Sequence, residues 1–307
     1  MKVLVTGGTG FVGQRLCEEL VDRGHEVTAL ARHPDDADLP NTVNTVMGDV
    51  SAYESIADAF EGQDAVVNLV ALSPLFQPPG NTSHDTVHRK GTENVVRACE
   101  EHGVGKLVQM SALGADPNGN TAYIRAKGQA EEAVKASSLD WVIFRPSVVF
   151  GDGGEFVSFT KKLTTPVVTG LPGGGKTRFQ PIWVGDLVPM LADAVESDEH
   201  VGQTYELGGP EVLTLADVTK LAYAAEGKSI TIVPIPMALA TIGLTLAGPI
   251  PFFPMGPDQA RSLKMDNTVI DNDVTAFGVE QTELRTLADY LGVAHEQPTA
   301  EPGTATA

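Results

Sequence analysis

Apolar residues in the first half of the chain follow two alternating spacings. Short runs rich in β-branched residues, typical of buried strands, occur at 2–7, 26–31, 44–50, 64–72, 106–111 and 141–146. The segments between them place apolar residues three and four positions apart, as in helices, at 10–23, 56–60, 86–102 and 122–137. Strands that alternate with helices predict an α/β fold, a doubly wound parallel sheet with right-handed crossovers.

This alternation weakens after Gly151, where glycine and proline become dense. Helical patterns at 187–197, 214–226 and 282–291 no longer alternate cleanly with strands. We therefore expect a nucleotide-binding domain at 1–150 and a smaller C-terminal substrate or lid lobe at 151–294, partly interleaved with the first domain. The tail at 295–307 is rich in Pro, Thr, Ala and Glu, which predicts disorder.

The charge of the chain is strongly acidic, with 40 acidic and 21 basic residues and a formal net charge of −19. A field of that sign repels phosphate backbones, so nucleic-acid binding is not expected. An acidic excess with few lysines suits a salt-rich cytosol in which charges are strongly screened, so we expect a halophilic source.

Other features of composition bear on compartment. Cys17 and Cys99 fall in helical patterns without ligand-like spacing, which predicts neither a disulfide nor a metal site. The chain begins with a strand pattern and shows no signal peptide, so a cytoplasmic protein is expected. Residues 229–257 carry no charge, but prolines leave only 237–247 continuous, short of the roughly 20 residues of a spanning helix. A buried helix or a lid over an apolar pocket is expected there, with peripheral membrane attachment left open.

The segment GLPGGGKT, Gly170 to Thr177, matches the phosphate-binding pattern G-x-x-x-x-G-K-[ST]. A working P-loop follows a buried strand and opens a helix. Here Pro181 blocks a helix and residues 182–184 look extended. We expect a surface or pocket-edge loop and no ATP site.

A second glycine motif, TGGTGFVG at Thr6 to Gly13, has the context that dinucleotide binding requires. It follows the first strand and enters the first helix. Gly7 permits the tight turn, Gly10 lets the backbone approach a pyrophosphate, and Gly13 lets the helix pack on the strand. The motif predicts a Rossmann-type dinucleotide site.

Several motifs together resemble the extended and atypical short-chain dehydrogenases/reductases. They are TGGTGFVG, RGHEV, GDV at 48–50, YIRAK at 123–127 and RPSVVFG at 145–151, and they cover most of residues 1–190. The segments SALGADPN, FQPIWVGDL and MDN near Asp266 resemble an atypical branch similar to the accessory nucleotide-binding subunit of respiratory complex I.

The motif and the resemblance together predict which residues contact the cofactor. These are Gly7, Thr9, Gly10, Phe11, Val12, Gly13, Arg32, Asp49, Val50, Leu69, Ala71, Lys127, Pro146 and Val148. In NAD-type sites a carboxylate at the end of the second strand binds the ribose hydroxyls. Ala31 holds that place here and Arg32 follows, so a 2′-phosphate would meet a guanidinium. We expect NADP(H) rather than NAD(H); the alternative is that Arg32 is a solvated strand-end charge.

Candidate catalytic residues are Tyr123, Lys127 and Ser111. Tyr123 and Lys127 lie one helical turn apart, on one face. The resemblance implies that the lysine holds the nicotinamide ribose and lowers the pKa of the tyrosine, which then exchanges a proton with a carbonyl or alcohol. Ser111 ends the fifth strand and would polarise the substrate carbonyl. Alternatively it is a structural hydroxyl, with the polarising position lost to Ala112 or Leu113.

Two further residues are candidate substrate contacts, His88 and Ser73. Many catalytic relatives carry an asparagine where His88 stands. His88 either takes over as a hydrogen-bonding group or caps a packed helix.

Two functions follow. The first is an NADP(H)-dependent oxidoreductase or epimerase acting on a small or amphipathic carbonyl or alcohol, with a sugar nucleotide as the family's common alternative substrate. The second is a non-catalytic NADPH-binding assembly or sensing protein associated with a membrane respiratory complex. The sequence does not predict the oligomeric state.

Overall fold

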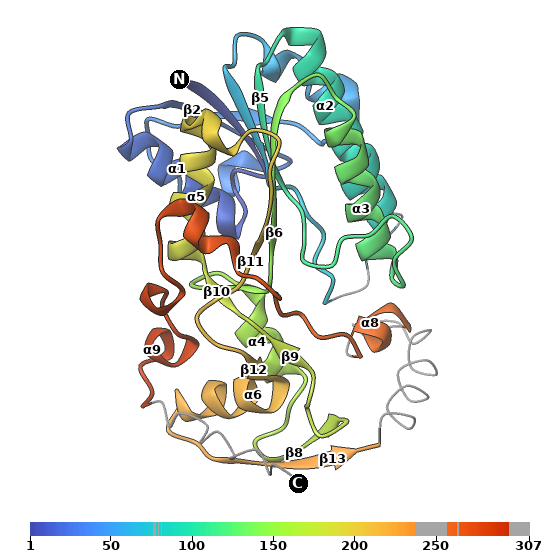
Figure 1. Ribbon diagram of the computed structural model, residues 1–307, viewed down its shortest axis with the longest axis vertical. Helices are drawn as coiled ribbons and strands as arrows, with labels where there is room; N and C mark the ends of the chain where they lie inside the picture. Colours follow the sequence, from blue (N-terminus) through green and yellow to red (C-terminus); the bar gives the residue numbers. More distant parts are fainter. Residues whose placement is uncertain (76–77, 79, 81, 237–256, 263, 295–307) are drawn as a thin grey trace, which may run out of the picture.

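A seven-stranded parallel sheet forms the upper half of the molecule (Figure 1). The computed structural model describes residues 1–75, 78, 80, 82–236, 257–262 and 264–294. In spatial order the strands are β11 (Thr204–Leu207), β6 (Asp140–Pro146), β5 (Lys106–Met110), β4 (Ala65–Asn68), β1 (Lys2–Thr6), β2 (Glu26–Ala31) and β3 (Asn44–Met47). The sheet runs outward in both directions from the β1–β4 pair, as in a doubly wound nucleotide-binding fold. The predicted fold class is confirmed, and β11 is a strand that the sequence analysis missed.

Helices cover both faces of this sheet (Figure 1). One face carries α1 (Phe11–Asp22) and α5 (Val184–Glu196), and the other carries α2 (Gly91–His102) and α3 (Ala122–Lys135). Successive strand residues point to opposite faces, so Val3 and Val5 join the core under α1 and α5 while Leu4 joins the core under α2. Burial on both faces explains why the strands read as nearly continuous apolar runs.

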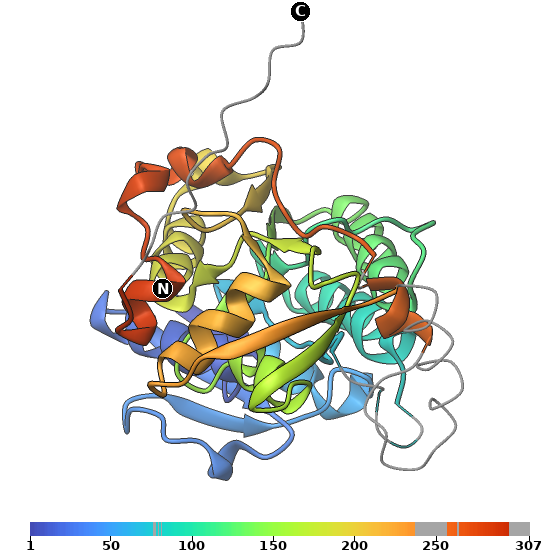
Figure 2. The ribbon, with the colours of Figure 1, turned by 90° about the horizontal axis from the view of Figure 1, so that it is seen from below.

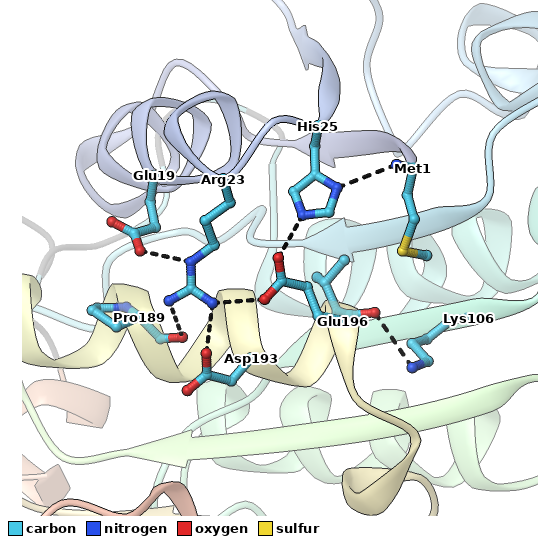
Figure 3. A network of polar contacts seen from close by, with 9 residues as sticks. Met1, Glu19, Arg23, His25, Lys106, Pro189, Asp193 and Glu196 are labelled. Carbon is cyan, nitrogen blue, oxygen red and sulfur yellow. Dashed lines mark hydrogen bonds and ion pairs between the residues drawn. The ribbon is translucent and has the colours of Figure 1, made fainter.

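An ion-pair network ties α1 to α5 (Figure 3). Arg23 at the end of α1 donates to Glu19, Asp193 and Glu196 at 2.6–2.8 Å. His25 contacts Glu196 through Nε2 at 2.8 Å. The network therefore holds α5, which comes much later in the chain, against α1 on the same face of the sheet.

A smaller lobe forms the lower half of the molecule in Figure 1, and Figure 2 shows it from below. It has a small apolar core of its own. Its elements are β7 (Val149–Phe150), α4 (Glu155–Lys162), β8 (Val167–Pro172), β9 (Arg178–Phe179), β10 (Ile182–Trp183), β12 (Leu213–Thr214), α6 (Leu215–Ala224), β13 (Ile230–Ile235), α8 (Pro257–Ser262), η7 (Gln281–Glu283) and α9 (Leu287–Leu291). Two 3₁₀ turns, η5 (Asp198–His200) and η6 (Asp273–Phe277), pack against the large sheet instead, since Asp198 pairs with Lys106 of β5 and Phe277 packs on Phe144 of β6. Phe150, Phe156, Leu213, Val218 and Leu287 form the core. In sequence, α5 and β11 lie between elements of the lower lobe. Because β11 is a strand of the large sheet and α5 packs on that sheet, the chain crosses between the two halves repeatedly.

Several predicted helices differ in detail. The segment 56–60 contains the 3₁₀ turn η3 (Ala57–Phe60), which follows another 3₁₀ turn, η2 (Tyr53–Ser55). A further 3₁₀ turn, η1 (Pro34–Asp36), follows β2. The segment 86–102 begins as a π-helix, η4 (Asp85–Lys90), before α2. The segment 282–291 is broken because Thr286 starts α9 anew, its Oγ1 accepting from the Asp289 amide at 3.0 Å.

The remaining expectations concern the glycine loop, the uncharged stretch and the tail. Gly173, Gly174 and Gly175 have positive φ, and the chain then enters β9, not a helix. Within the uncharged stretch, residues 230–235 form β13, parallel to β8. The rest of the stretch and the predicted tail fall at 237–256 and 295–307, outside the described residues. Among the described residues, no helix has the length and apolar character needed to span a membrane.

Candidate functional site

A cavity of about 890 Å³ lies at the carboxyl ends of the strands. Its walls come from the segments that follow β1, β2, β4, β5 and β6, which is where ligands bind in open α/β sheets. Every residue predicted to contact the cofactor lines it, as do Tyr123, Ser111 and Ser73. His88 is not among the lining residues. The structure therefore brings together, in one cavity, motifs that are up to 140 positions apart.

The glycine turn between β1 and α1 forms one wall. Gly7 has φ +77° and donates to the Leu30 carbonyl at 2.8 Å, and Gly10 donates to the Gly7 carbonyl at 2.9 Å. A Cβ on Gly13 would lie 2.2 Å from the Gly7 oxygen, so only glycine permits this approach. Gly10 is the N-cap of α1 and makes no side-chain cap bond, which leaves the first amides of the helix available to an anion. These residues fit a dinucleotide pyrophosphate.

The far end of the cavity is lined by Arg32, Asp49 and Val50. Arg32 is exposed, and no ion pair ties it to another residue in the described part of the chain. The Asp49 carboxylate accepts from the Ser51 amide at 2.8 Å, and Asn94 holds the Val50 carbonyl at 2.7 Å. These bonds hold the loop at Asp49 and Val50 in place, whereas the Arg32 guanidinium has no ion-pair partner among the described residues.

Tyr123 and Lys127 lie on the first turns of α3. Thr121 caps this helix, its Oγ1 accepting from the Ile124 amide at 3.2 Å. Lys127 is 2% exposed and donates to the Met110 carbonyl at 2.9 Å. Burial lowers the pKa of Lys127 to about 8. Burial also raises the pKa of the Tyr123 phenol, so the expected lowering of its pKa by Lys127 is wrong for this state.

Ser111 lies in the cavity wall, but its hydroxyl is already engaged. It donates to Glu131 Oε1 at 2.5 Å, and Glu131 also accepts two bonds from Arg145 at 2.7 and 2.8 Å. Burial acts to raise the pKa of Glu131, but the bonds from Arg145 and Ser111 outweigh it and hold that pKa below its ordinary value. An ionised carboxylate only accepts, so Ser111 must donate its proton to Glu131. This geometry favours the structural alternative for Ser111.

Both candidate substrate contacts have defined partners. The Ser73 hydroxyl accepts from the Leu75 amide at 3.3 Å, within the loop after β4. His88 is 1% exposed, and its Nε2 accepts from the Leu72 amide at 3.4 Å. Its ring packs edge-on against Tyr123, with the ring centroids 5.3 Å apart. His88 therefore lies behind Tyr123 and not in the wall itself.

Sequence reasoning missed Asn267, which fixes the cavity wall after β6. Its Oδ1 accepts from the Ser147 hydroxyl at 2.7 Å and from the Val148 amide at 3.1 Å. Its backbone pairs with Arg178 and Gln180. The sequence predicted the MDN segment only by its resemblance to other proteins, because a contact between residues 120 positions apart leaves no local pattern in the sequence.

The fold and the cavity define a dinucleotide-binding protein of the doubly wound α/β class. The family model described as NAD(P)H-binding matches residues 7–168, more than half of the chain, so the protein belongs to that family. It is an atypical member of the short-chain dehydrogenases/reductases, in the branch similar to a complex I subunit.

Relatives of known name span several activities. The chain is 29% identical over 293 residues to the mitochondrial NADH dehydrogenase [ubiquinone] 1 alpha subcomplex subunit 9 of Arabidopsis thaliana, covering 87% of this chain and 71% of that protein. It is 36% identical over 180 residues to the 2-alkyl-3-oxoalkanoate reductase of Stenotrophomonas maltophilia, covering 50% of this chain and 53% of the reductase. The structure of UDP-glucose 4-epimerase from Thermus thermophilus with NAD has a TM-score of 0.64 at 24% identity, covering 96% of this chain and all of that chain, which shows the shared fold. The named relatives thus include a complex I subunit and a reductase, and the epimerase shares the fold.

Proposed function

We propose that this protein is an NADP(H)-dependent oxidoreductase acting on the carbonyl or alcohol of an apolar or amphipathic molecule. One observation carries the proposal: the glycine turn and the Tyr123–Lys127 pair line the same cavity. Beyond them, its walls are largely apolar, with Leu72, Leu75, Val87, Ile124, Phe156, Phe179 and Met265. The only lysine or arginine side chains among the described lining residues are Arg32 and Lys127, both assigned to the cofactor. This argues against a sugar-nucleotide diphosphate as substrate.

The chain's own residues have distinct parts in such a reaction. The bound dinucleotide supplies or accepts the hydride. The α1 amides would hold its pyrophosphate, and Lys127 would hold the nicotinamide ribose by hydrogen bonding. Tyr123, kept protonated by its high pKa, donates its proton to the substrate oxygen during reduction. The acid form of the phenol is the form that reduction requires.

The test is NADPH oxidation by the purified protein, in high salt, against a panel of apolar and amphipathic ketones. We expect turnover with at least one ketone, and Tyr123→Phe should reduce kcat by about a hundredfold or more while leaving NADPH affinity unchanged. Turnover that survives Tyr123→Phe would remove Tyr123 from the mechanism.

The preference for NADP(H) forms part of this proposal and is supported by the unpaired guanidinium of Arg32 at the far end of the cavity. Titration calorimetry should give a lower dissociation constant for NADPH than for NADH. Arg32→Ala should raise the NADPH constant about tenfold or more and leave the NADH constant nearly unchanged. Tighter binding of NADH by the unaltered protein would contradict the preference.

A second candidate is an NADPH-binding assembly protein of a respiratory complex. It is favoured by the likeness to the complex I subunit and by the engaged hydroxyl of Ser111. Tight NADPH binding without turnover on any ketone, together with co-fractionation with membranes, would support it over the enzyme.

A further inference from the structure

His88 presents a buried hydrogen-bond donor without an acceptor. The Leu72 amide donates to Nε2, so Nε2 is the unprotonated nitrogen of the ring. Burial lowers the pKa of His88 well below its ordinary value, and the charge of Lys127 acts in the same direction, so the ring is neutral. A neutral imidazole with an accepting Nε2 carries its proton on Nδ1. That Nδ1 has no hydrogen-bond partner within the described residues.

His84 adds a second unpartnered nitrogen beside it. The two rings are stacked with centroids 5.4 Å apart, and both pack edge-on against Tyr123. His84 is 5% exposed, and its Nδ1 also lacks a partner among the residues that the structure describes. The π-helix η4 begins here, and such irregular turns are frequent at functional sites.

The charged groups around this pair come from three elements. Burial lowers the pKa of His84, Asp258 on α8 acts to raise that pKa, and Lys127 on α3 acts to lower it. On η4 itself, Asp85 is paired with Arg89 and Lys90. Among the residues that the structure describes, no charged group therefore satisfies either Nδ1, and a water molecule is small enough to do so in a polar, buried site.

We propose that His84 and His88 bind a water behind Tyr123, and that this water links the phenol oxygen to the His88 Nδ1–H. The inference rests on the proposed function, because the water would stabilise the phenolate that Tyr123 becomes when it gives its proton to the substrate oxygen. His88 is a positioning residue that acts through the water on Tyr123.

The proton balance is simple. As the hydride of the reduced dinucleotide forms a bond to the carbonyl carbon, the Tyr123 O–H bond breaks and its proton goes to the substrate oxygen. The phenolate that remains accepts a hydrogen bond from the water, and the water accepts one from His88 Nδ1–H. The imidazole keeps its own proton throughout, and solvent returns a proton to Tyr123 after the product leaves.

The first test does not depend on activity. NMR of the ring nitrogens in the isotope-labelled full chain, assigned with His88→Phe, should show His88 at neutral pH with Nδ1 protonated and Nε2 unprotonated. A neutral ring protonated on Nε2, or a charged imidazolium, would overturn the proposal.

The second test is kinetic. His88→Phe keeps a packed ring without a donor and should lower kcat for ketone reduction about tenfold, with the KM for NADPH unchanged. In the oxidation direction, where the phenolate is the base, the limb on which activity rises with pH should move up by about one pH unit, since the phenolate loses a stabilising bond. His88→Asn, which retains an N–H donor, should recover most of the loss.

A buried histidine elsewhere supplies the matched control. His200 is 7% exposed, and its Nδ1 is bonded to the Tyr205 hydroxyl at 2.8 Å, outside the cavity. His200→Phe should leave kcat and the pH limb unchanged. Equal turnover in the wild-type protein and His88→Phe, or an equal loss in both phenylalanine variants, overturns this inference alone. A wild-type protein without turnover on any ketone overturns the proposed function.

Discussion

Lys127 is a single residue whose charged form is destabilised by burial in the candidate site. The residue is 2% exposed, and its ammonium donates to a neutral carbonyl, that of Met110, at 2.9 Å. Burial lowers its pKa from 10.5 to about 8. The unfolded chain thus holds this proton up to higher pH than the folded chain. Between about pH 8 and 10.5 the unfolded state binds more protons, so this residue makes the free energy of unfolding rise with pH.

Lys127→Met should therefore stabilise the cofactor-free protein. Below pH 8 the full cost of the buried charge is present, so the gain at pH 7 should be on the order of 2–3 kcal/mol. It should fade as the pH approaches 10.5. Thermal unfolding at a series of pH values measures this.

Lys106→Met is the matched control. Lys106 is also buried but donates to the Val195 and Ser197 carbonyls and pairs with Asp198 at 2.8 Å. Because that charge has partners, its removal should destabilise the protein. Destabilisation by Lys127→Met at pH 7 would show that the lysine has a partner other than Met110 in the folded state.

For single residues, the sequence predicted which side chains lie together in the site but not their hydrogen bonds or pKa values. Tyr123 and Lys127 were predictable because four positions on a helix fix one face. The state of Ser111 was not, because its acceptor Glu131 is supplied by the next helix and ionised by Arg145 from a strand beyond it. The pKa of Tyr123 was predicted in the wrong direction because burial by His84 and His88 has no local pattern.

The contact between β1 and α1 is the element-scale feature on which the cofactor site depends. A Cβ on Gly13 would meet the Gly7 oxygen at 2.2 Å and the Gly8 Cα at 2.8 Å. Both are backbone atoms that cannot rotate away, so in Gly13→Ala the helix must move off the strand. We expect a loss of about 1–3 kcal/mol in unfolding free energy and at least a tenfold weaker binding of NADPH. Calorimetric titration and denaturant unfolding measure the two effects.

Gly105→Ala provides the comparison. Gly105 is exposed, and the nearest atom to an added Cβ is the Asp64 oxygen at 3.9 Å. Its effect on stability should stay within about half a kcal/mol. If the two alanine variants bound NADPH equally well, the close approach of α1 would not be what shapes the site.

Elements were predictable in proportion to how completely they are buried. β1, β4 and β5 are covered on both faces, and each reads as a plain apolar run. β11 was missed because it is a four-residue edge strand whose residues alternate between buried and half-buried. The π-helix of η4 was predicted as ordinary helix, since a widened turn changes hydrogen bonds without changing the apolar spacing that follows it.

The property that belongs to the whole molecule is its charge of −19. Self-repulsion among surface carboxylates opposes the compact state, and it is spread over the molecule, so no single substitution removes it. Salt shortens the range of this repulsion from about 10 Å at 0.1 M to about 3 Å at 1 M. Exposed ion pairs such as Arg97–Glu101 and Lys228–Glu226 weaken in salt too, but such solvent-exposed pairs contribute little to stability.

We therefore propose that the protein is adapted to high salt, and we expect its Tm to rise continuously as potassium chloride increases from 0.1 M to the molar range. Sucrose at matched osmolality separates the causes: it strengthens burial of surface but screens no charge, so it should give a smaller rise. NADPH is itself an anion, and its approach to a molecule of the same sign should quicken as salt screens the repulsion, whereas an association driven by attraction slows. A Tm that is highest in dilute buffer, with NADPH association slowing as salt is added, would mean that the acidic surface is only a solubility feature and that local ion pairs dominate the electrostatics of this fold.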